Sequence, residues 1–301
     1  MEIFVTGGTG LVGRYLINKL VERGDKVVCL TRNSDQARRV LPQGVEFIEA
    51  NPVIPGDWQS RPSQCDAVIN LAGEPVFDGF WTKGQKRKIR RSRLSSTFNV
   101  IESIEDCDHP LTLINASAAG YYGEGGPKAL PENSQPGDGF LARLACEWEH
   151  TAMQGESENV RVVMFRIGIV LSNEGGALPK LIKPFNMGFG GHLGNGRQYF
   201  PWIHIHDLVE SIFFALDNPA ISGPVNAAVP TPPTQKEFSK VLSAKLDKSA
   251  WFPVPGFALK LFLGERADAL LQSQRVLPNV LKANGFRFKY DDLDEALADL
   301  F

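Results

Sequence analysis

The stretch of residues 3–13, IFVTGGTGLVG, decides the fold. It joins a short apolar strand, residues 3–6, to a helix that starts at Leu11. The glycines between them fit the dinucleotide-binding pattern Gly-x-Gly-x-x-Gly in the strand-to-helix context that the pattern needs. Such glycines let the backbone approach a pyrophosphate, while the helix N-terminus supplies oriented N–H groups. The alternative is a tight turn that binds nothing. We predict cofactor contacts at Gly7, Thr9, Gly10, Leu11, Val12 and Gly13.

Strands and helices alternate through the first half of the chain. The further strands expected are Lys26–Leu30, Val45–Ile48, Asp66–Leu71, Leu111–Ala116 and Val160–Phe165. The helices expected are Leu11–Arg23, Asp35–Leu41, Lys83–Ile104 and Phe140–Met153. The strands are continuous apolar runs, which are typical of a parallel sheet buried on both faces. This alternation predicts an α/β fold, a doubly wound parallel sheet of Rossmann type.

The pattern becomes less regular after residue 171, where glycine-rich loops begin. We expect residues 1–171, with 200–229 returning to them, to form a nucleotide-binding domain. Residues 172–199 and 230–301 would form a smaller substrate-side lobe. Such a lobe would close over the carboxyl edge of the sheet, where ligands bind in folds of this kind.

Two polar residues flank an expected strand-to-helix join at residues 203–216. Asp207 is expected to be the N-cap of this helix, because aspartate accepts well from first-turn N–H groups. His204 is expected to be a hydrogen-bonded wall of the substrate side. A metal site needs more ligands than this pair supplies, so no metal is predicted.

Composition excludes several classes of function. The 301 residues carry 32 Lys+Arg against 34 Asp+Glu, a net charge of -2. This balance provides no global attraction to nucleic acid or to anionic membranes. No apolar run approaches the roughly 20 residues that span a bilayer, and the first residues enter a strand without a signal-peptide pattern. The four cysteines are scattered, so neither a disulfide framework nor a zinc site is predicted. A cytoplasmic protein is the expectation.

The end of the second strand indicates which dinucleotide is bound. Enzymes that use NAD place Asp or Glu there, to accept from the ribose 2′-hydroxyl. This chain has Thr31 and Arg32 instead. An arginine suits a 2′-phosphate, so we predict NADP(H), with Thr31 and Arg32 at the adenosine end. The alternative is a solvated surface arginine.

Several motifs together resemble a known family. The glycine turn, Asn70-Leu71-Ala72-Gly73 and the segment 117–123 (SAAGYYG) resemble the extended short-chain dehydrogenases/reductases, the NAD-dependent epimerase/dehydratase superfamily. Gly73-Glu74-Pro75, Trp81, Ser92-Arg93 and the tail after Pro230 resemble its atypical subgroup with a conserved C-terminal domain. The resemblance implies cofactor contacts at Leu71, Ala72, Gly73 and Ser117.

The chain departs from that family at the catalytic helix. The family carries Tyr-x-x-x-Lys, in which the tyrosine transfers a proton and the lysine lowers its pKa. Here the helix begins with Phe140, which exchanges no proton, and Arg143 remains as a cation that could hold the nicotinamide ribose. The candidates for catalysis are therefore Ser117, Tyr121, Tyr122 and Arg143. The alternatives are structural roles: the Ser117 hydroxyl would bond to the backbone at the end of its strand, and the Tyr122 ring would pack in the wall of the pocket.

Three functions remain open at this point. The first is an NADP(H)-dependent oxidoreductase or epimerase-type enzyme that acts on a small-molecule substrate. The second is an NADP(H)-binding redox sensor without turnover, and the third an inactive scaffold. A monomer and a homodimer are both compatible with the sequence. One helix face is expected to carry a solvated stripe of basic residues, which are Lys83, Lys86, Arg87, Arg90 and Arg93. The alternative is that Arg93 contacts an anionic substrate.

Overall fold

The computed structural model describes residues 1–249 and 252–301, and a parallel β-sheet lies at its centre. Its seven strands lie in the order β10-β7-β5-β4-β1-β2-β3, and every neighbouring pair is parallel. The doubly wound α/β fold predicted from the apolar runs is therefore confirmed. The strands are β1 (Glu2–Thr6), β2 (Lys26–Thr31), β3 (Glu46–Glu49), β4 (Ala67–Asn70), β5 (Leu111–Ala118), β7 (Val160–Ile167) and β10 (Gly223–Ala227).

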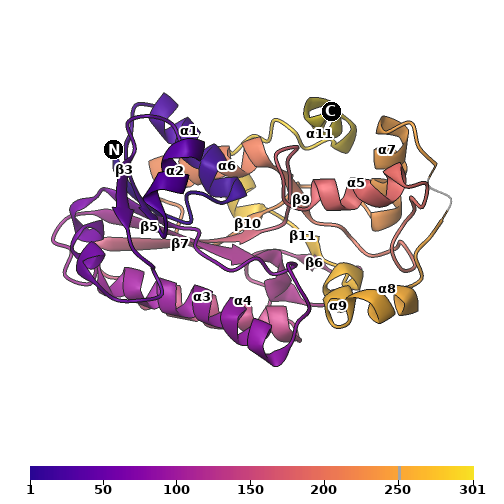
Figure 1. Cartoon of the computed structure of the whole chain (residues 1–301), viewed down its shortest axis with the longest axis horizontal. Helices are drawn as coiled ribbons and strands as arrows, with labels where there is room; N and C mark the ends of the chain where they lie inside the picture. The colour runs from indigo at the N-terminus through magenta and orange to yellow at the C-terminus, as the bar shows by residue number, and fades with distance from the viewer. Residues whose placement is uncertain (250–251) are drawn as a thin grey trace.

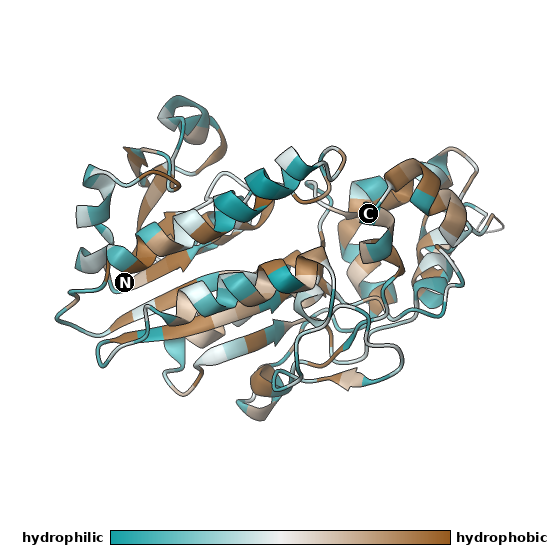
Figure 2. Cartoon of the chain, turned by 90° about the horizontal axis from the view of Figure 1, so that it is seen from below, coloured by the Kyte–Doolittle hydropathy of each residue, from teal (hydrophilic) through white to brown (hydrophobic). Residues whose placement is uncertain are grey.

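Helices cover both faces of this sheet (Figure 1). They are α1 (Leu11–Glu22), α2 (Ser34–Val40) and α6 (Ile205–Asp217) on one face, and α3 (Lys83–Glu102) and α4 (Phe140–Met153) on the other. Leu16 and Ile212 lie in the core of the first face, and Val100 and Ala152 in that of the second. Figure 2 shows apolar colouring along the strands, and both apolar and polar residues along the helices. Burial on both faces is what continuous apolar strands require.

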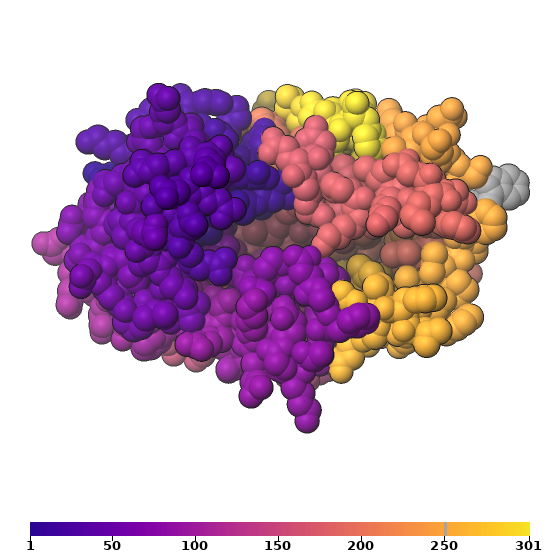
Figure 3. Space-filling model, viewed as in Figure 1, coloured from indigo at the N-terminus to yellow at the C-terminus, as the bar shows by residue number. Residues whose placement is uncertain are grey.

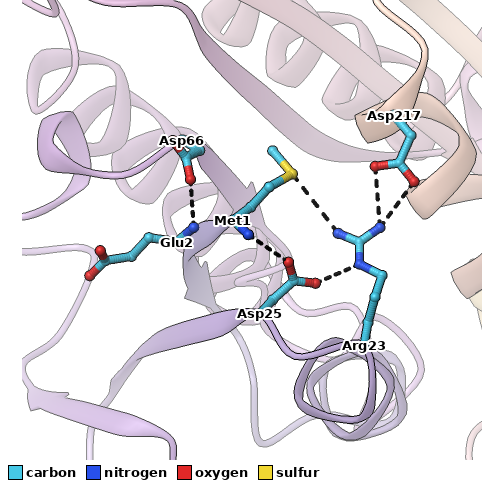
Figure 4. Close-up of polar contacts among 6 residues, drawn as sticks. All are labelled: Met1, Glu2, Arg23, Asp25, Asp66 and Asp217. Carbon is cyan, nitrogen blue, oxygen red and sulfur yellow. Dashed lines mark hydrogen bonds and ion pairs between the residues drawn. The ribbon is translucent and has the colours of Figure 1, made fainter.

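A polar cluster fixes the amino end of the sheet, away from the strand ends where ligands bind (Figure 4). The Met1 ammonium group donates to Asp25 Oδ1 at 2.9 Å, and Arg23 Nε donates to Asp25 Oδ2 at 2.5 Å. Arg23 Nη1 also donates to Asp217 Oδ2 at 3.1 Å, at the end of α6. The start of β1 is thereby tied to the loop before β2 and to a helix of the covering layer.

A second lobe extends from the carboxyl edge of the sheet. Its own core contains Leu178, Trp202, Phe238 and Leu297. Figure 3 shows a recess between this lobe and the indigo-to-magenta part of the chain. The lobe and its connections contain α5 (Leu178–Asn186), α7 (Gln235–Lys245), α8 (Gly256–Leu263), α9 (Arg266–Leu271), α10 (Asn279–Ala283), α11 (Leu293–Leu300) and the short pairs β8 (Ile169–Leu171) with β9 (Trp202–His204) and β6 (Ala129–Leu130) with β11 (Arg275–Val276).

The expectation that Asp207 caps α6 is wrong. The N-cap is His204, whose Nδ1 accepts from the backbone N–H of His206 at 3.2 Å. The carboxylate of Asp207 instead accepts from the backbone N–H groups of Lys289 and Tyr290, at 2.9 and 2.8 Å. Asp207 therefore holds the C-terminal segment against α6, a contact between residues too distant in sequence to be visible as a cap.

Three further features follow from the described residues. None of their helices combines the length and the apolar character that crossing a membrane demands. All four cysteines are free thiols, three of them buried. No group of three potential His, Cys, Asp or Glu ligands lies close enough to hold a metal ion in the part of the chain described here.

Candidate functional site

The order of the sheet reverses between β1 and β4, and this reversal locates the site. In doubly wound folds, ligands bind outside the carboxyl ends of the strands at this switch point. The chain after β1 lies very close to the chain after β4. A Cβ built on Gly7 would be 2.7 Å from the backbone carbonyl of Leu71, and Gly7 adopts a positive φ of 71°. Only glycine fits this position, because any side chain would meet backbone there.

The glycine turn presents the start of α1 to this switch point. Gly10 is the N-cap of α1, and no side chain caps the helix. The first turn carries no acidic residue, so no negative charge of its own opposes a bound anion. The turn is also tightly packed: a Cβ on Gly13 would be 2.4 Å from the carbonyl oxygen of Gly7. A dinucleotide pyrophosphate fits such an uncapped helix N-terminus with close backbone approach.

The end of β2 presents Arg32 to solvent. Thr31 is buried, and its hydroxyl is 3.3 Å from both the backbone N–H and the carbonyl oxygen of Asn33. Arg32 is exposed and has no ion-pair partner among the described residues. The nearest acid on the adjacent strand is Glu49, which already accepts from the backbone N–H and hydroxyl of Ser34 at 2.8 and 2.5 Å. A 2′-phosphate could therefore reach Arg32 without displacing a salt bridge.

A buried polar chain lies beneath the end of β4. Thr6 donates to Asn70 Oδ1 at 2.6 Å, and Asn70 Nδ2 donates to Thr97 and Asn115 at 2.8 and 2.7 Å. Trp148 Nε1 donates to the Thr97 hydroxyl at 2.8 Å. These bonds link β1, β4 and β5 to α3 and α4. They fix the backbone that continues into Leu71, Ala72 and Gly73, the residues that the family resemblance assigns to cofactor binding.

The hydroxyl of Ser117, near the end of β5, is directed to an internal ion pair. It donates to Glu149 Oε1 at 2.6 Å. Arg166 holds the same carboxylate in a two-pronged contact, with Nε and Nη2 each 2.8 Å from one oxygen. Arg166 Nη1 also donates to the Tyr122 hydroxyl, which in turn donates to Asn226 Oδ1 at 2.7 Å. All five side chains are buried.

The two tyrosines after β5 differ in access. Tyr122 is 2% exposed, and burial raises the pKa of its phenol to about 12. Tyr121 is half-buried, and burial raises its pKa as well, although the guanidinium of Arg166 lies 3.6 Å from its ring centroid. Neither phenol becomes a phenolate at neutral pH. Both are therefore suited to donate a proton rather than to remove one.

The sequence of α4 contains neither tyrosine nor lysine. Phe140 packs edge-on against Trp81, with ring centroids 5.2 Å apart. Four residues on, Leu144 is buried at 4% exposure. Arg143 is exposed and has no ion-pair partner in the described ranges. Of the predicted catalytic residues, the structure thus brings Ser117 and Tyr122 into one network, whereas Arg143 lies outside it.

Sequence reasoning missed Glu149 and Arg166, which organise this network. The expected strand ended at Phe165, whereas β7 continues to Ile167 and pairs Arg166 directly with Ser117. Burial alone would lower the pKa of Arg166, but its bonds to Glu149 raise it above the usual value. The signal was present as charges within apolar runs, since a buried charge in a strand requires a partner.

Comparison with known proteins identifies two regions of the chain. The NAD dependent epimerase/dehydratase family matches residues 3–228, and a domain of unknown function, DUF1731, matches residues 254–300. The chain is 38% identical to the chloroplastic epimerase family protein SDR39U1 homolog of Arabidopsis thaliana, covering 99% of this chain and 86% of that protein. It is also 38% identical to the epimerase family protein YfhF of Bacillus subtilis, covering 100% and 98%.

Two solved structures resemble this one over its whole length. The human epimerase family protein SDR39U1, solved with NADPH, is 29% identical with a TM-score of 0.87, covering 100% of this chain and 99% of that one. A nucleoside-diphosphate sugar epimerase from Corynebacterium glutamicum is 32% identical with a TM-score of 0.80, covering 100% of this chain and 58% of that one.

Proposed function

The chain belongs to the NAD dependent epimerase/dehydratase family, and from this premise we propose that it is an NADP(H)-dependent oxidoreductase acting on a small carbonyl or hydroxyl substrate. The substrate would occupy the recess between the sheet edge and the second lobe (Figure 3). When bound, the nicotinamide supplies or accepts a hydride.

The observation that carries the proposal is the glycine turn. Gly7 and Gly13 leave no room for a Cβ, and α1 begins without a side-chain cap. The N–H groups of Leu11, Val12 and Gly13 lie in the first turn of α1, where helical N–H groups have no partner within the helix. They would receive the pyrophosphate, with Thr9 at the rim.

Two observations favour NADP(H) over NAD(H). Arg32 is free to meet a 2′-phosphate, and Glu49 is already occupied by Ser34. Human SDR39U1, at 29% identity over the whole chain, was solved with NADPH. Leu71, Ala72 and Gly73 would line the nicotinamide-ribose side, with Arg143 as a further cation near the ribose.

Proton transfer would fall to Tyr121. Its phenol is only half-buried and stays protonated at neutral pH, whereas the Tyr122 hydroxyl is held by Arg166 and Asn226. A protonated phenol donates to a substrate oxygen that gains charge, which favours reduction of a carbonyl as the direction of reaction. Ser117 would align the substrate oxygen only by leaving Glu149, so its contribution here is to position the end of β5.

A redox sensor without turnover is the second candidate. The commitment of both Ser117 and Tyr122 to internal partners favours it. A sensor needs the glycine turn but no proton donor, because it responds to which form of the dinucleotide is bound.

Fluorescence and absorbance measurements test the proposal. We expect the protein to enhance NADPH fluorescence on binding, and to bind NADPH more tightly than NADH. Oxidation of NADPH, followed by absorbance, should occur with at least one member of a panel of ketones, aldehydes and quinones. Absence of NADPH binding would refute the function altogether. Binding without turnover across the panel would favour the sensor.

A further inference from the structure

Arg93 differs from the other cations of the basic stripe because its guanidinium group lies at the switch point. A Cβ built on Gly73 would be 3.1 Å from Cζ of Arg93. The guanidinium also packs against the ring of Trp148, with its Cζ 5.1 Å from the ring centroid. The guanidinium of Arg93, a residue of α3, therefore lies between α3 and α4, beside the exposed backbone that follows β4. A ligand lying over Gly73 would meet this cation.

The acid near Arg93 is engaged by another cation. Within residues 1–249 and 252–301, no carboxylate forms an ion pair with Arg93. Glu74 is the nearby acid, but its carboxylate contacts Lys88 at 2.6 Å. Burial lowers the pKa of the Arg93 guanidinium to about 10, and the charge of Glu74 offsets this only in part. By contrast, Lys86 pairs with Glu265 and Arg90 with Glu147.

Part of the Arg93 donor set is also unused. Nη1 donates to the backbone carbonyls of Glu74 and Ile89, at 3.0 and 3.3 Å. Nε and Nη2 have no acceptor among the described residues, and the Arg93 side chain is only partly buried. A guanidinium fork with free donors matches a carboxylate or a phosphate.

We propose that Arg93 binds an anionic group of the substrate, a carboxylate or a phosphate ester, held over Gly73 in the recess. This inference rests on the proposed function, because it requires a substrate in that recess. A half-buried cation without a counter-charge is costly, and an anionic ligand would offset the cost. The proposal thereby narrows the substrate class to anionic carbonyl or hydroxyl compounds.

The anion would come from the substrate rather than from the cofactor. The cofactor's pyrophosphate has the uncapped start of α1, and its 2′-phosphate has Arg32 at the end of β2. Arg93 lies on α3, beside Gly73 after β4. The guanidinium of Arg93 also places a positive charge against α4, through its contact with Trp148. The residue four positions after Phe140, where the family pattern has its lysine, is the uncharged Leu144.

The test uses the whole protein loaded with NADP⁺. Binding of acetate, inorganic phosphate and neutral acetamide is followed by NMR through the arginine Nε–Hε resonances. The resonance of Arg93 is the one that is absent from the spectrum of R93K. We expect both anions, but not acetamide, to shift it. By calorimetry, we expect R93Q to weaken binding of the anions by about tenfold. The control R91Q changes an exposed arginine on the same helix and should leave that binding unchanged.

Each outcome distinguishes this inference from the proposed function. If the wild type binds NADP⁺ but the Arg93 resonance is unmoved by both anions, this inference is wrong while the function stands. It is also wrong if R93Q loses affinity for NADP⁺ rather than for the anions, because Arg93 would then serve the cofactor. If the wild type does not bind NADP(H), the proposed function is wrong. The resonance shift in the wild type decides the matter even if R93Q does not fold.

Discussion

The glycine turn after β1 and the segment after β5 share one edge of the sheet, yet they use their polar groups in opposite ways. At the glycine turn, α1 begins with no side chain over its N–H groups. At the end of β5, the hydroxyls of Ser117 and Tyr122 are held by Glu149, Arg166 and Asn226. The N–H groups of the first region are thus available to a ligand, whereas the hydroxyls of the second already donate to groups of the protein.

Under the function that we propose, dinucleotide binding and proton transfer depend on different regions of one crevice. Pyrophosphate recognition depends on backbone, which the fold supplies wherever glycines allow close approach. Proton transfer depends on particular side chains, and Phe140 has no proton to exchange. The absence of tyrosine and lysine from α4 therefore says little about whether a dinucleotide binds.

The largest expected effect is loss of binding in Gly10→Val. Gly10 has φ -73° and ψ 172°, which a side chain can adopt, and its Cβ would meet only the Gly7 carbonyl at 3.3 Å. The valine would occupy the space where the pyrophosphate approaches the backbone. We expect affinity for NADPH to fall by about a hundredfold or more, with the thermal midpoint nearly unchanged. Fluorescence titration and thermal unfolding measure the two quantities.

The matched variant Gly13→Ala should differ from Gly10→Val by losing stability. Its Cβ would lie 2.4 Å from the Gly7 carbonyl oxygen, so the turn itself must shift. We expect a loss of stability of about 1–3 kcal/mol from overpacking. If Gly10→Val still bound NADPH tightly, the pyrophosphate would lie elsewhere, and the contrast between the two regions would fail.

The second effect concerns the tyrosines and applies to any carbonyl that the enzyme reduces. Tyr121→Phe should lower kcat by about 10²- to 10⁴-fold, because the proton donor is removed. Tyr122→Phe should lower stability more than kcat, since its hydroxyl bonds to Arg166 and Asn226 inside the protein. Steady-state kinetics and urea unfolding of both variants measure this. Equal kcat for Tyr121→Phe and the wild type would show that Tyr121 is not the proton donor.

The third effect is on stability alone. Glu149→Gln leaves the buried cation of Arg166 without its counter-charge, and breaking such a pair costs about 3–5 kcal/mol. Glu147→Gln, on the same helix, breaks a half-exposed pair with Arg90 and should cost no more than about 1 kcal/mol. Urea unfolding compares them. NADPH affinity should be retained by the folded fraction of both, and its loss in Glu149→Gln would mean that the two regions are coupled.

The sequence predicted the sheet well because the information is local. Most strands of the large sheet are largely apolar runs that alternate with helices along the chain, which predicts a parallel sheet but not the order of the strands within it. The short pairs β6 with β11 and β8 with β9 were not predicted. They consist of two or three residues that pair across long separations, with no periodicity to reveal them.

The site was only partly accessible from the sequence for the same reason. Gly7 to Gly13 form one contiguous turn, so their spacing predicts their geometry. Ser117 donates to Glu149 on α4, and Glu149 also accepts from Arg166 on β7. Only the folded chain brings these three residues together. A charged residue inside an apolar strand was the available signal. It predicts that a partner exists, but not which one.

The smallest expected effect concerns Arg32 at the end of β2, where the adenosine part of the cofactor would lie. Arg32→Ala removes an exposed cation that has no partner in the described part of the chain, so the fold should be unaffected. A charge-assisted contact to a phosphate at such a solvated site contributes about 1.5 kcal/mol, so affinity for NADPH should fall about tenfold. Affinity for NADH, which lacks the 2′-phosphate, should stay the same. Titration of both dinucleotides at low and high salt measures this, since screening should reduce the difference between wild type and variant. An equal loss for NADPH and NADH would mean that Arg32 contacts the adenine or ribose, and the preference for NADP(H) would then need another source.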